Sequence, residues 1–297
     1  MSDHQPLAYH SLEFLESDEA RPLRILAEYL EPLRRFQIQN IQDTVVFFGS
    51  ARIDSRIDAE RALARLSPER RGRGGKKASI SDSRRRAFAD RLKRSRQAVA
   101  WSRYYEDARV LARMLTEWSL TLNTPRHRFV VCSGGGPGIM EAANRGAHEA
   151  GGKTIGLNIR LPFEQGANRY ITPGLHFEFH YFFMRKFWFA YLARALVIFP
   201  GGFGTLDEMF EFLTLAQTQK LSKKLDVILY GSEYWDGILN LEPMAEWGAI
   251  AEEDLNLLHR FDSPDDAFEH LRGHLAQHLV PETPQEDRAP GIAKTRG

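Results

Sequence analysis

Three times along the chain, a short apolar run is followed by a glycine-containing loop and then by a helical pattern. The runs Thr44 to Phe48, Phe129 to Cys132 and Ala195 to Phe199 end in FGSA, SGGGPG (133–138) and PGGFGT (200–205). Short continuous apolar runs are typical of strands that are covered on both faces. Such strands alternating with helices predict a Rossmann-like α/β fold, with a doubly wound, mainly parallel sheet and helices on both faces.

The predicted Rossmann-like domain covers residues 41–278 and is flanked by two shorter segments. Residues 1–40 predict an accessory N-terminal helical segment, because Pro22 suits a first helical turn and leucines follow at helical spacing. Residues 279–297 predict a disordered tail, since the segment is rich in Pro, Gly and charged residues.

A basic insertion at residues 53–96 separates the first strand from the next helix. Within it, residues 61–96 hold fourteen Lys and Arg against three Asp and Glu, whereas the net charge of the 297-residue chain is only +1. The insertion has few apolar residues, so we expect an exposed and mobile loop. RRGRGGKK (70–77) also permits nucleic-acid binding, but with Phe88 as its one aromatic residue the insertion offers little for bases to stack on, and we expect no nucleic-acid partner.

Two features of the sequence bear on the location of the protein. The longest apolar run, Phe187 to Phe199, contains Arg194 and is too short to span a bilayer, and no basic-then-apolar signal pattern precedes it at the N-terminus. We therefore expect a cytoplasmic protein without membrane contact.

The single Cys132 excludes an intrachain disulfide, and we expect it in the core.

The glycine loops are candidate phosphate sites. Glycine lets the backbone approach a phosphate, and the helix behind the loop offers free N–H groups and a positive dipole end. Ile139 stands where a dinucleotide fingerprint has its third glycine, and no Gly-Lys-Ser/Thr is present, so neither that fingerprint nor a Walker loop is predicted. A bare turn explains one such loop equally well. The candidate binding residues in the three loops are Gly49, Ser50, Gly134, Gly135, Gly136, Gly201, Gly202, Gly204 and Thr205.

Two further patterns each leave two interpretations open. Glu208 follows Thr205 by three residues, so it either forms a capping box with Thr205 or points its carboxylate into the site. The helix around Met184, Arg185 and Lys186 is apolar on almost every side yet carries two adjacent cations. Either these cations escape to solvent at the first helical turn, or they face an anion such as a phosphate or Glu208.

Together, SGGGPGIMEAAN, the Met184-Arg185-Lys186 helix and PGGFGTLDE resemble the LOG (Lonely Guy) family over about residues 43–275. PGGxGTxxE with an upstream Met-Arg-Lys helix is the signature of these cytokinin riboside 5′-monophosphate phosphoribohydrolases and their bacterial AMP nucleosidase relatives, which were long labelled lysine decarboxylases. Nothing in this sequence marks a pyridoxal-phosphate lysine site. The basic insertion and the N-terminal helix depart from the short plant members.

The resemblance implies hydrolysis of a nucleoside 5′-monophosphate to a free base, either adenine or a cytokinin-type base, and ribose 5-phosphate. It also implies a homodimer or larger assembly and no metal or redox cofactor. By motif position, the catalytic residues are Arg185 and Glu208, with Met184 and Lys186 beside the substrate. A carboxylate suits this chemistry, because breaking the C1′–N bond develops positive charge on the ribose. Arg185 either holds the phosphate or keeps Glu208 ionised. The alternative function is a non-catalytic nucleotide or cofactor carrier of the same fold.

Overall fold

The computed structural model describes residues 7–66, 82–160, 166–218, 220 and 225–279. Its strands are β1 (Thr44–Phe48), β2 (Val130–Ser133), β3 (Thr154–Ile159), β4 (His176–Phe179), β5 (Ala193–Ile198), β6 (Asp226–Tyr230) and β7 (Leu258–Phe261). Its α-helices are α1 (Leu12–Glu16), α2 (Arg21–Ile38), α3 (Arg56–Leu66), α4 (Asp82–Thr121), α5 (Ile139–Glu149), α6 (Phe182–Leu192), α7 (Phe203–Gln217), α8 (Ser232–Asp236), α9 (Glu242–Glu246) and α10 (Pro264–Ala276). Short 3-10 turns lie at Ala8–His10, Glu252–Leu257 and Gln277–Leu279.

In the described part of the chain, seven parallel strands form one sheet in the order β4-β3-β2-β1-β5-β6-β7. The chain winds outward from β1 through β2, β3 and β4, then returns to the other side of β1 with β5 and winds the opposite way. The predicted doubly wound, Rossmann-like fold is therefore confirmed. The winding direction reverses between β1 and β5, and the carboxyl ends of such strands open a crevice in which ligands bind.

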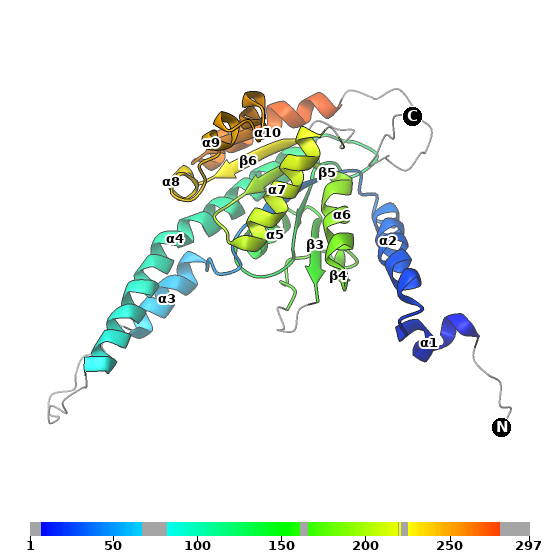
Figure 1. Cartoon of the computed structure of the whole chain (residues 1–297), viewed down its shortest axis with the longest axis horizontal. Coiled ribbons are helices and arrows are strands. Elements are labelled where there is room, and N and C mark those ends of the chain that lie inside the picture. Colours follow the sequence, from blue (N-terminus) through cyan, green and yellow to red (C-terminus); the bar gives the residue numbers. More distant parts are fainter. Residues whose placement is uncertain (1–6, 67–81, 161–165, 219, 221–224, 280–297) are drawn as a thin grey trace.

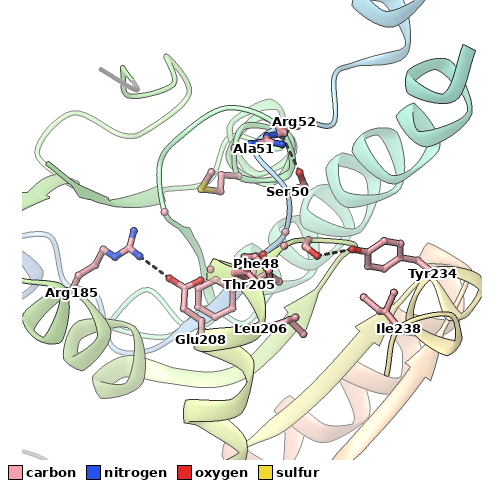
Figure 2. Close-up of a pocket in the computed structure, with 17 residues that line it drawn as sticks. Phe48, Ser50, Ala51, Arg52, Arg185, Thr205, Leu206, Glu208, Tyr234 and Ile238 are labelled. Atoms are coloured by element: carbon pink, nitrogen blue, oxygen red, sulfur yellow. Dashed lines mark hydrogen bonds and ion pairs between the residues drawn. The ribbon is translucent and has the colours of Figure 1, made fainter. Parts of the chain in front are cut away.

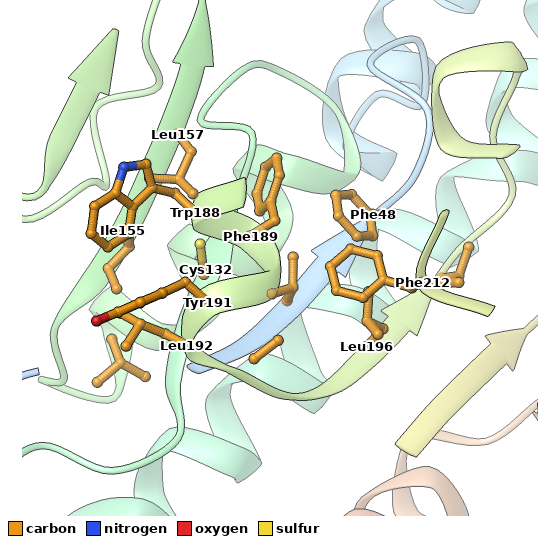
Figure 3. Packing of buried hydrophobic residues seen from close by; sticks show 14 of the residues in the cluster. Phe48, Cys132, Ile155, Leu157, Trp188, Phe189, Tyr191, Leu192, Leu196 and Phe212 are labelled. Carbon is orange, nitrogen blue, oxygen red and sulfur yellow. The ribbon is translucent and has the colours of Figure 1, made fainter. Parts of the chain in front are cut away.

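Helices cover both faces of the sheet (Figure 1). Successive residues of a strand point to opposite faces, and in the central strands both sets are apolar, so each face requires a layer of helices. Val46 and Phe48 of β1 belong to the core beneath α2, α6 and α7, which Figure 3 shows around Phe189. Val45 and Phe47 belong to the second core, beneath α4, α5 and α10. Cys132 is buried in the first core, as expected, and burial raises the pKa of its thiol.

The N-terminal helix α2 lies against α6, where the sequence predicted a helix (Figure 1). Pro22 is in its first turn, as the sequence suggested. The indole Nε1 of Trp188 on α6 donates a hydrogen bond of 2.8 Å to the Glu28 carbonyl oxygen, and Phe36 packs against the same indole ring. These contacts fix α2 to the helix that carries the Met-Arg-Lys motif.

The expectation of a loop at residues 53–96 is wrong for the parts that the structure describes. Helix α3 begins at Arg56, and α4 begins at Asp82 and runs for 40 residues, extending past the sheet with α3 beside it (Figure 1). Arg, Lys, Ala and Leu are strong helix formers, so a helix forms here without burying a full apolar face. RRGRGGKK (70–77) lies outside the described residues, as does nearly all of the predicted tail.

Two smaller findings complete the fold. The edge strand β7 was not predicted, because its sequence LHRF is neither continuously apolar nor bounded by glycine. Gly151 follows the end of α5 with a φ of 78°, a left-handed conformation that glycine adopts readily and that stops a helix. Among the helices in the described ranges, none has both the length and the apolar character that crossing a membrane requires.

Candidate active site

A cavity of about 740 Å³ lies at the carboxyl ends of β1 and β5 (Figure 2). This position is the crevice where the winding of the sheet reverses, and all three glycine loops contribute to the wall. The lining residues are Phe48, Gly49, Ser50, Ala51, Arg52, Gly134, Met140, Arg185, Gly201, Gly202, Phe203, Gly204, Thr205, Leu206, Glu208, Tyr234 and Ile238.

The PGGFGT loop leads directly into the first turn of α7. The helix begins at Phe203 with Gly202 as N-cap, so its first backbone N–H groups have no acceptor within the helix. A Cβ atom built on Gly202 or Gly204 meets nothing within 4 Å, whereas one on Gly201 would lie 2.2 Å from Thr205 Oγ1. The loop therefore presents open backbone to the cavity at Gly202 and Gly204, while Gly201 is required by the close approach of Thr205.

Glu208 does not form the capping box that was one interpretation of the sequence. The helix starts two residues before Thr205, so Thr205 lies inside the first turn and is not the N-cap residue. Instead, the Glu208 carboxylate accepts a hydrogen bond of 2.8 Å from Arg185 Nη2 of α6 (Figure 2). The two side chains are 11% and 14% exposed, and both line the cavity.

Burial dominates the electrostatics of Glu208 and raises its pKa to about 7. The neighbouring guanidinium of Arg185 opposes this effect and lowers the pKa, as does Lys186 more weakly, whereas the carboxylate of Asp207 raises it. A carboxyl group with a pKa near neutrality can exchange a proton with a reacting group at physiological pH. The cavity thus contains one buried acid whose ionisation depends on the cations beside it.

The adjacent cations Arg185 and Lys186 pair with different carboxylates. Lys186 Nζ lies 2.8 Å from Asp207 and 3.1 Å from Glu211, on the side of α7 away from the cavity lining. Both cations therefore face anions, as one interpretation predicted, and the anions are the carboxylates of α7. Met184 is 7% exposed and packs in the core, so neither Met184 nor Lys186 is among the residues that line the cavity.

The SGGGPG loop contributes only its first glycine to the cavity wall. A Cβ on Gly134 would lie 2.7 Å from Met140 Sδ and 4.0 Å from Arg185 Nη1, so glycine leaves room for both side chains. Gly135 and Gly136 are not among the lining residues. Their carbonyl oxygens accept hydrogen bonds of 3.1 Å from Asn168 Nδ2. These two predicted binding residues therefore help to fix the conformation of the loop, and they do not line the cavity.

The FGSA loop is tied to the PGGFGT loop. The Ser50 backbone N–H donates to the Pro200 carbonyl oxygen at 2.9 Å, and Ser50 Oγ accepts from the Arg52 N–H at 3.1 Å. A Cβ on Gly49 would lie 2.8 Å from Ile139 at the start of α5, so this glycine permits close packing of loop against helix. Gly49 and Ser50, two of the predicted binding residues, both line the cavity.

Sequence reasoning missed Arg52, Tyr234 and Ile238, which also line the cavity. Tyr234 donates a hydrogen bond of 2.7 Å from its hydroxyl to the Gly201 carbonyl oxygen, and so supports the PGGFGT loop. Its position after the carboxyl end of β6 was an available signal, since ligands gather along that edge of the sheet. Arg52 directly follows FGSA and precedes the predicted insertion at 53–96, and the motif gave no sign that its side chain reaches the cavity.

One family model and several curated proteins match part of this chain in sequence. A family model described as a possible lysine decarboxylase matches residues 140–271. The cytokinin riboside 5′-monophosphate phosphoribohydrolase LOG of Oryza sativa is 32% identical over 158 residues, which cover 50% of this chain and 58% of that protein. A probable enzyme of the same name from Arabidopsis thaliana is 26% identical over 149 residues, covering 50% and 74%. The match to the rice protein thus spans little more than half of its length.

Solved structures are also similar to this chain, at lower levels. A molybdenum cofactor binding protein from Rippkaea orientalis is 22% identical with a TM-score of 0.38, covering 57% of this chain and 87% of that one. A molybdenum cofactor carrier protein from Chlamydomonas reinhardtii is 24% identical with a TM-score of 0.38, covering 58% and 89%. Similarity at this level is not informative about ligands.

The sequence matches and the motifs point the same way. The family match includes the whole of the Met-Arg-Lys helix and the PGGFGTLDE segment, whose Arg185 and Glu208 side chains meet in the cavity. These findings confirm that the chain resembles the LOG family of cytokinin riboside 5′-monophosphate phosphoribohydrolases.

Proposed function

We propose that this protein hydrolyses the N-glycosidic bond of a nucleoside 5′-monophosphate, releasing the base and ribose 5-phosphate. The observation that carries the proposal is the pair formed by Arg185 and Glu208, 2.8 Å apart on the wall of a cavity whose adjacent wall is the glycine-rich start of α7. One cavity thereby combines an anion-binding helix terminus with a buried carboxylate, which are the two elements that this reaction needs.

The first turn of α7 suits the 5′-phosphate. Its free N–H groups and the positive end of the helix dipole favour an anion, and the open space at Gly202 and Gly204 lets the phosphate approach the backbone. Thr205 adds a hydroxyl group in the same turn. Binding energy from the phosphate would hold the ribose in place, so that C1′ lies beside the reacting carboxylate.

Glu208 suits the reacting end of the substrate. As the C1′–N bond breaks, its electron pair leaves with the base and positive charge develops on the ribose, which a fixed carboxylate stabilises. Water then adds to C1′, and Glu208 accepts the proton that the water loses. The raised pKa of about 7 makes the carboxylate a competent base near neutral pH. The departing base takes up a proton in turn, which balances the reaction.

Arg185 supports the ionised form of Glu208. Its guanidinium contacts the carboxylate directly and lowers the pKa that burial raises, so it keeps part of the Glu208 population charged at neutral pH. Of the two roles that the sequence left open, this contact favours the one through Glu208 for the ligand-free protein. We therefore assign Arg185 as the residue that keeps the Glu208 carboxylate ionised and oriented.

The test is base release from a panel of 5′-monophosphates, nucleosides and triphosphates, together with equilibrium binding. We expect cleavage of 5′-monophosphates, including AMP, and little cleavage of plain nucleosides, since these lack the anchoring phosphate. Glu208→Gln should lower kcat by about 10³-fold while AMP binding persists. Arg185→Lys should retain more activity than Arg185→Ala, because it keeps the positive charge.

Glu211→Gln is the matched control, because Glu211 lies one turn further along α7, contacts Lys186 instead of Arg185, and raises the pKa of Glu208 less than Asp207 does. Its kcat should stay within about threefold of the wild-type value. Tight binding of a monophosphate without any base release would instead support the non-catalytic carrier. Equal cleavage of nucleosides and monophosphates would contradict the role given to α7.

A further inference from the structure

A second group of chemically active side chains lies at the opposite end of the sheet from the cavity. Asp226 is the first residue of β6, at the amino end of that strand, whereas the cavity lies at the carboxyl ends. His259 of β7 and His270 of α10 direct their Nε2 atoms toward the Asp226 carboxylate. The proposed hydrolase reaction uses none of these three residues.

The distances between the donor atoms match those of a metal coordination shell. His259 Nε2 lies 3.5 Å from Asp226 Oδ1, and His270 Nε2 lies 3.2 Å from the same oxygen and 3.0 Å from Oδ2. Neighbouring ligands of a tetrahedral ion with bonds of about 2.0–2.1 Å are separated by roughly 3.4 Å. One ligand atom from each residue lies within 4.8 Å of the others, so small side-chain rotations bring all three to one ion.

The burial of the three side chains is also suited to an ion. The Asp226 carboxylate is 2% exposed, and its Oδ2 has no aligned hydrogen-bond donor among the described residues. A buried carboxylate requires a positive partner. The imidazoles of His259 and His270 are 45% and 30% exposed, which leaves an approach from solvent and room for water as a fourth ligand. The ring of Phe261 covers His270 on one side, with centroids 5.0 Å apart.

We propose that Asp226, His259 and His270 bind a first-row divalent transition-metal ion of the Zn²⁺ type. Two imidazole nitrogens and one carboxylate oxygen are ligands that Zn²⁺ prefers, whereas Mg²⁺ and Ca²⁺ prefer sites made of oxygen alone. The ion joins three elements from separate parts of the chain: strand β6, the edge strand β7 and helix α10. Its role is structural, since it fastens β7 to the rest of the sheet; among the strands that the structure describes, β7 pairs with β6 alone.

The test uses the full-length, untagged protein after removal of bound metal with a chelator. Titration with Zn²⁺ should show one ion bound per chain with a Kd at or below about 10 µM. At saturating Zn²⁺ the Tm should rise by roughly 5 °C, because the ion binds the folded state alone. Substitution with Co²⁺ should give the visible d–d absorption of a low-symmetry, four-coordinate site.

Variants of the two half-exposed histidines identify the ligands without disturbing the core. His259→Gln and His270→Gln should each weaken Zn²⁺ binding at least about tenfold and remove the rise in Tm. His274→Gln, one turn further along α10, is the matched control and should bind Zn²⁺ as the wild type does. Absence of stoichiometric binding, or binding that survives in both the His259 and His270 variants, overturns the proposal. Base release should be unchanged in all three variants, so the outcome is separate from that of the proposed hydrolase.

Discussion

Replacing Asp207 by asparagine tests whether Glu208 acts as a base whose ionisation its neighbours control. The Asp207 carboxylate raises the pKa of Glu208, and it also contacts Lys186, a cation that lowers the same pKa. Removing this negative charge leaves the charge of Lys186 less compensated, so both effects favour ionised Glu208. Asp207→Asn should therefore lower the pKa of Glu208 and extend activity to lower pH.

The size of the shift follows from Coulomb's law. For two charges taken as roughly 7 Å apart, at an effective dielectric constant between about 40 and about 80, Coulomb's law gives an interaction of about 0.6–1.2 kcal/mol. One pKa unit corresponds to about 1.4 kcal/mol, so the interaction amounts to about 0.4–0.9 of a pH unit. Since the Asp207 side chain is 58% exposed, solvent screens the interaction. We expect a shift of about half a pH unit, toward the lower end of the range.

The assay is kcat/KM for AMP as a function of pH, because this quantity reports ionisations of the free enzyme. With a Glu208 pKa of about 7, the ionised fraction is about one tenth at pH 6 and about one half at pH 7, so the wild-type value should rise about tenfold between pH 6 and its plateau. The substrate phosphate also ionises, near pH 6, but its contribution is the same for every variant.

The comparison with a control variant isolates the effect of Glu208. Asp265→Asn removes an exposed carboxylate in the first turn of α10, on the other side of the sheet, and should leave the acid limb of the profile in place. An Asp207→Asn limb that coincides with the wild-type limb, or that moves to higher pH, would refute the assignment of Glu208 as the ionising base.

Three further predictions concern packing and assembly. Gly201→Ala should destabilise the fold by about 1–3 kcal/mol in chemical denaturation, since its Cβ would lie 2.2 Å from Thr205 Oγ1. Gly202→Ala is the control: it has open space around it and should change the free energy of unfolding by less than about 0.5 kcal/mol. Asn168→Ala should raise KM for the monophosphate severalfold in steady-state kinetics, because it removes the hydrogen bonds that hold the SGGGPG loop; an unchanged KM would show that the loop keeps its shape alone. Leu26→Asp, which places a charge on the exposed apolar face of α2, should shift the expected homodimer toward monomer in sedimentation velocity, and wild-type protein that sediments as a monomer would rule this interface out.

The sequence was sufficient for the central part of the fold. Thr44 to Phe48 and Ala195 to Phe199 are continuously apolar because both faces of those strands are covered, so their burial was visible in the pattern. Helix α3 and the start of α4 were not recognised, because the absence of an apolar face was taken as absence of structure. The edge strand β7 escaped notice since it is half-buried and carries His259 and Arg260.

The candidate site divides in a similar way. Loops with a strong local pattern, such as PGGFGT, were recognised at once, and Glu208 was recognised with its alternative. Local spacing does not reveal which carboxylate a cation meets, so the partners of Arg185 and Lys186 required the packing of α6 on α7. Asn168 and Tyr234 act through hydrogen bonds to backbone carbonyls far away in the sequence. Asn168 has no local signal, and the position of Tyr234 after β6 indicates the edge of the sheet but not its partner Gly201.

Helix α4 is one continuous element with two different stabilities. Its C-terminal half is anchored by Tyr105, Leu111 and Leu115, which are fully or almost fully buried, while side chains near its start, such as Phe88, are exposed. A helix packed against a single neighbouring helix, as α4 is against α3 beyond the sheet, opens at lower cost than one held in the core of the domain. Amide hydrogens should therefore exchange along α4 in a gradient, fastest near Ser83 and slowest near Leu115. Fraying at the far end of α4 would then leave the carboxyl edge of the sheet, with its candidate active site, undisturbed.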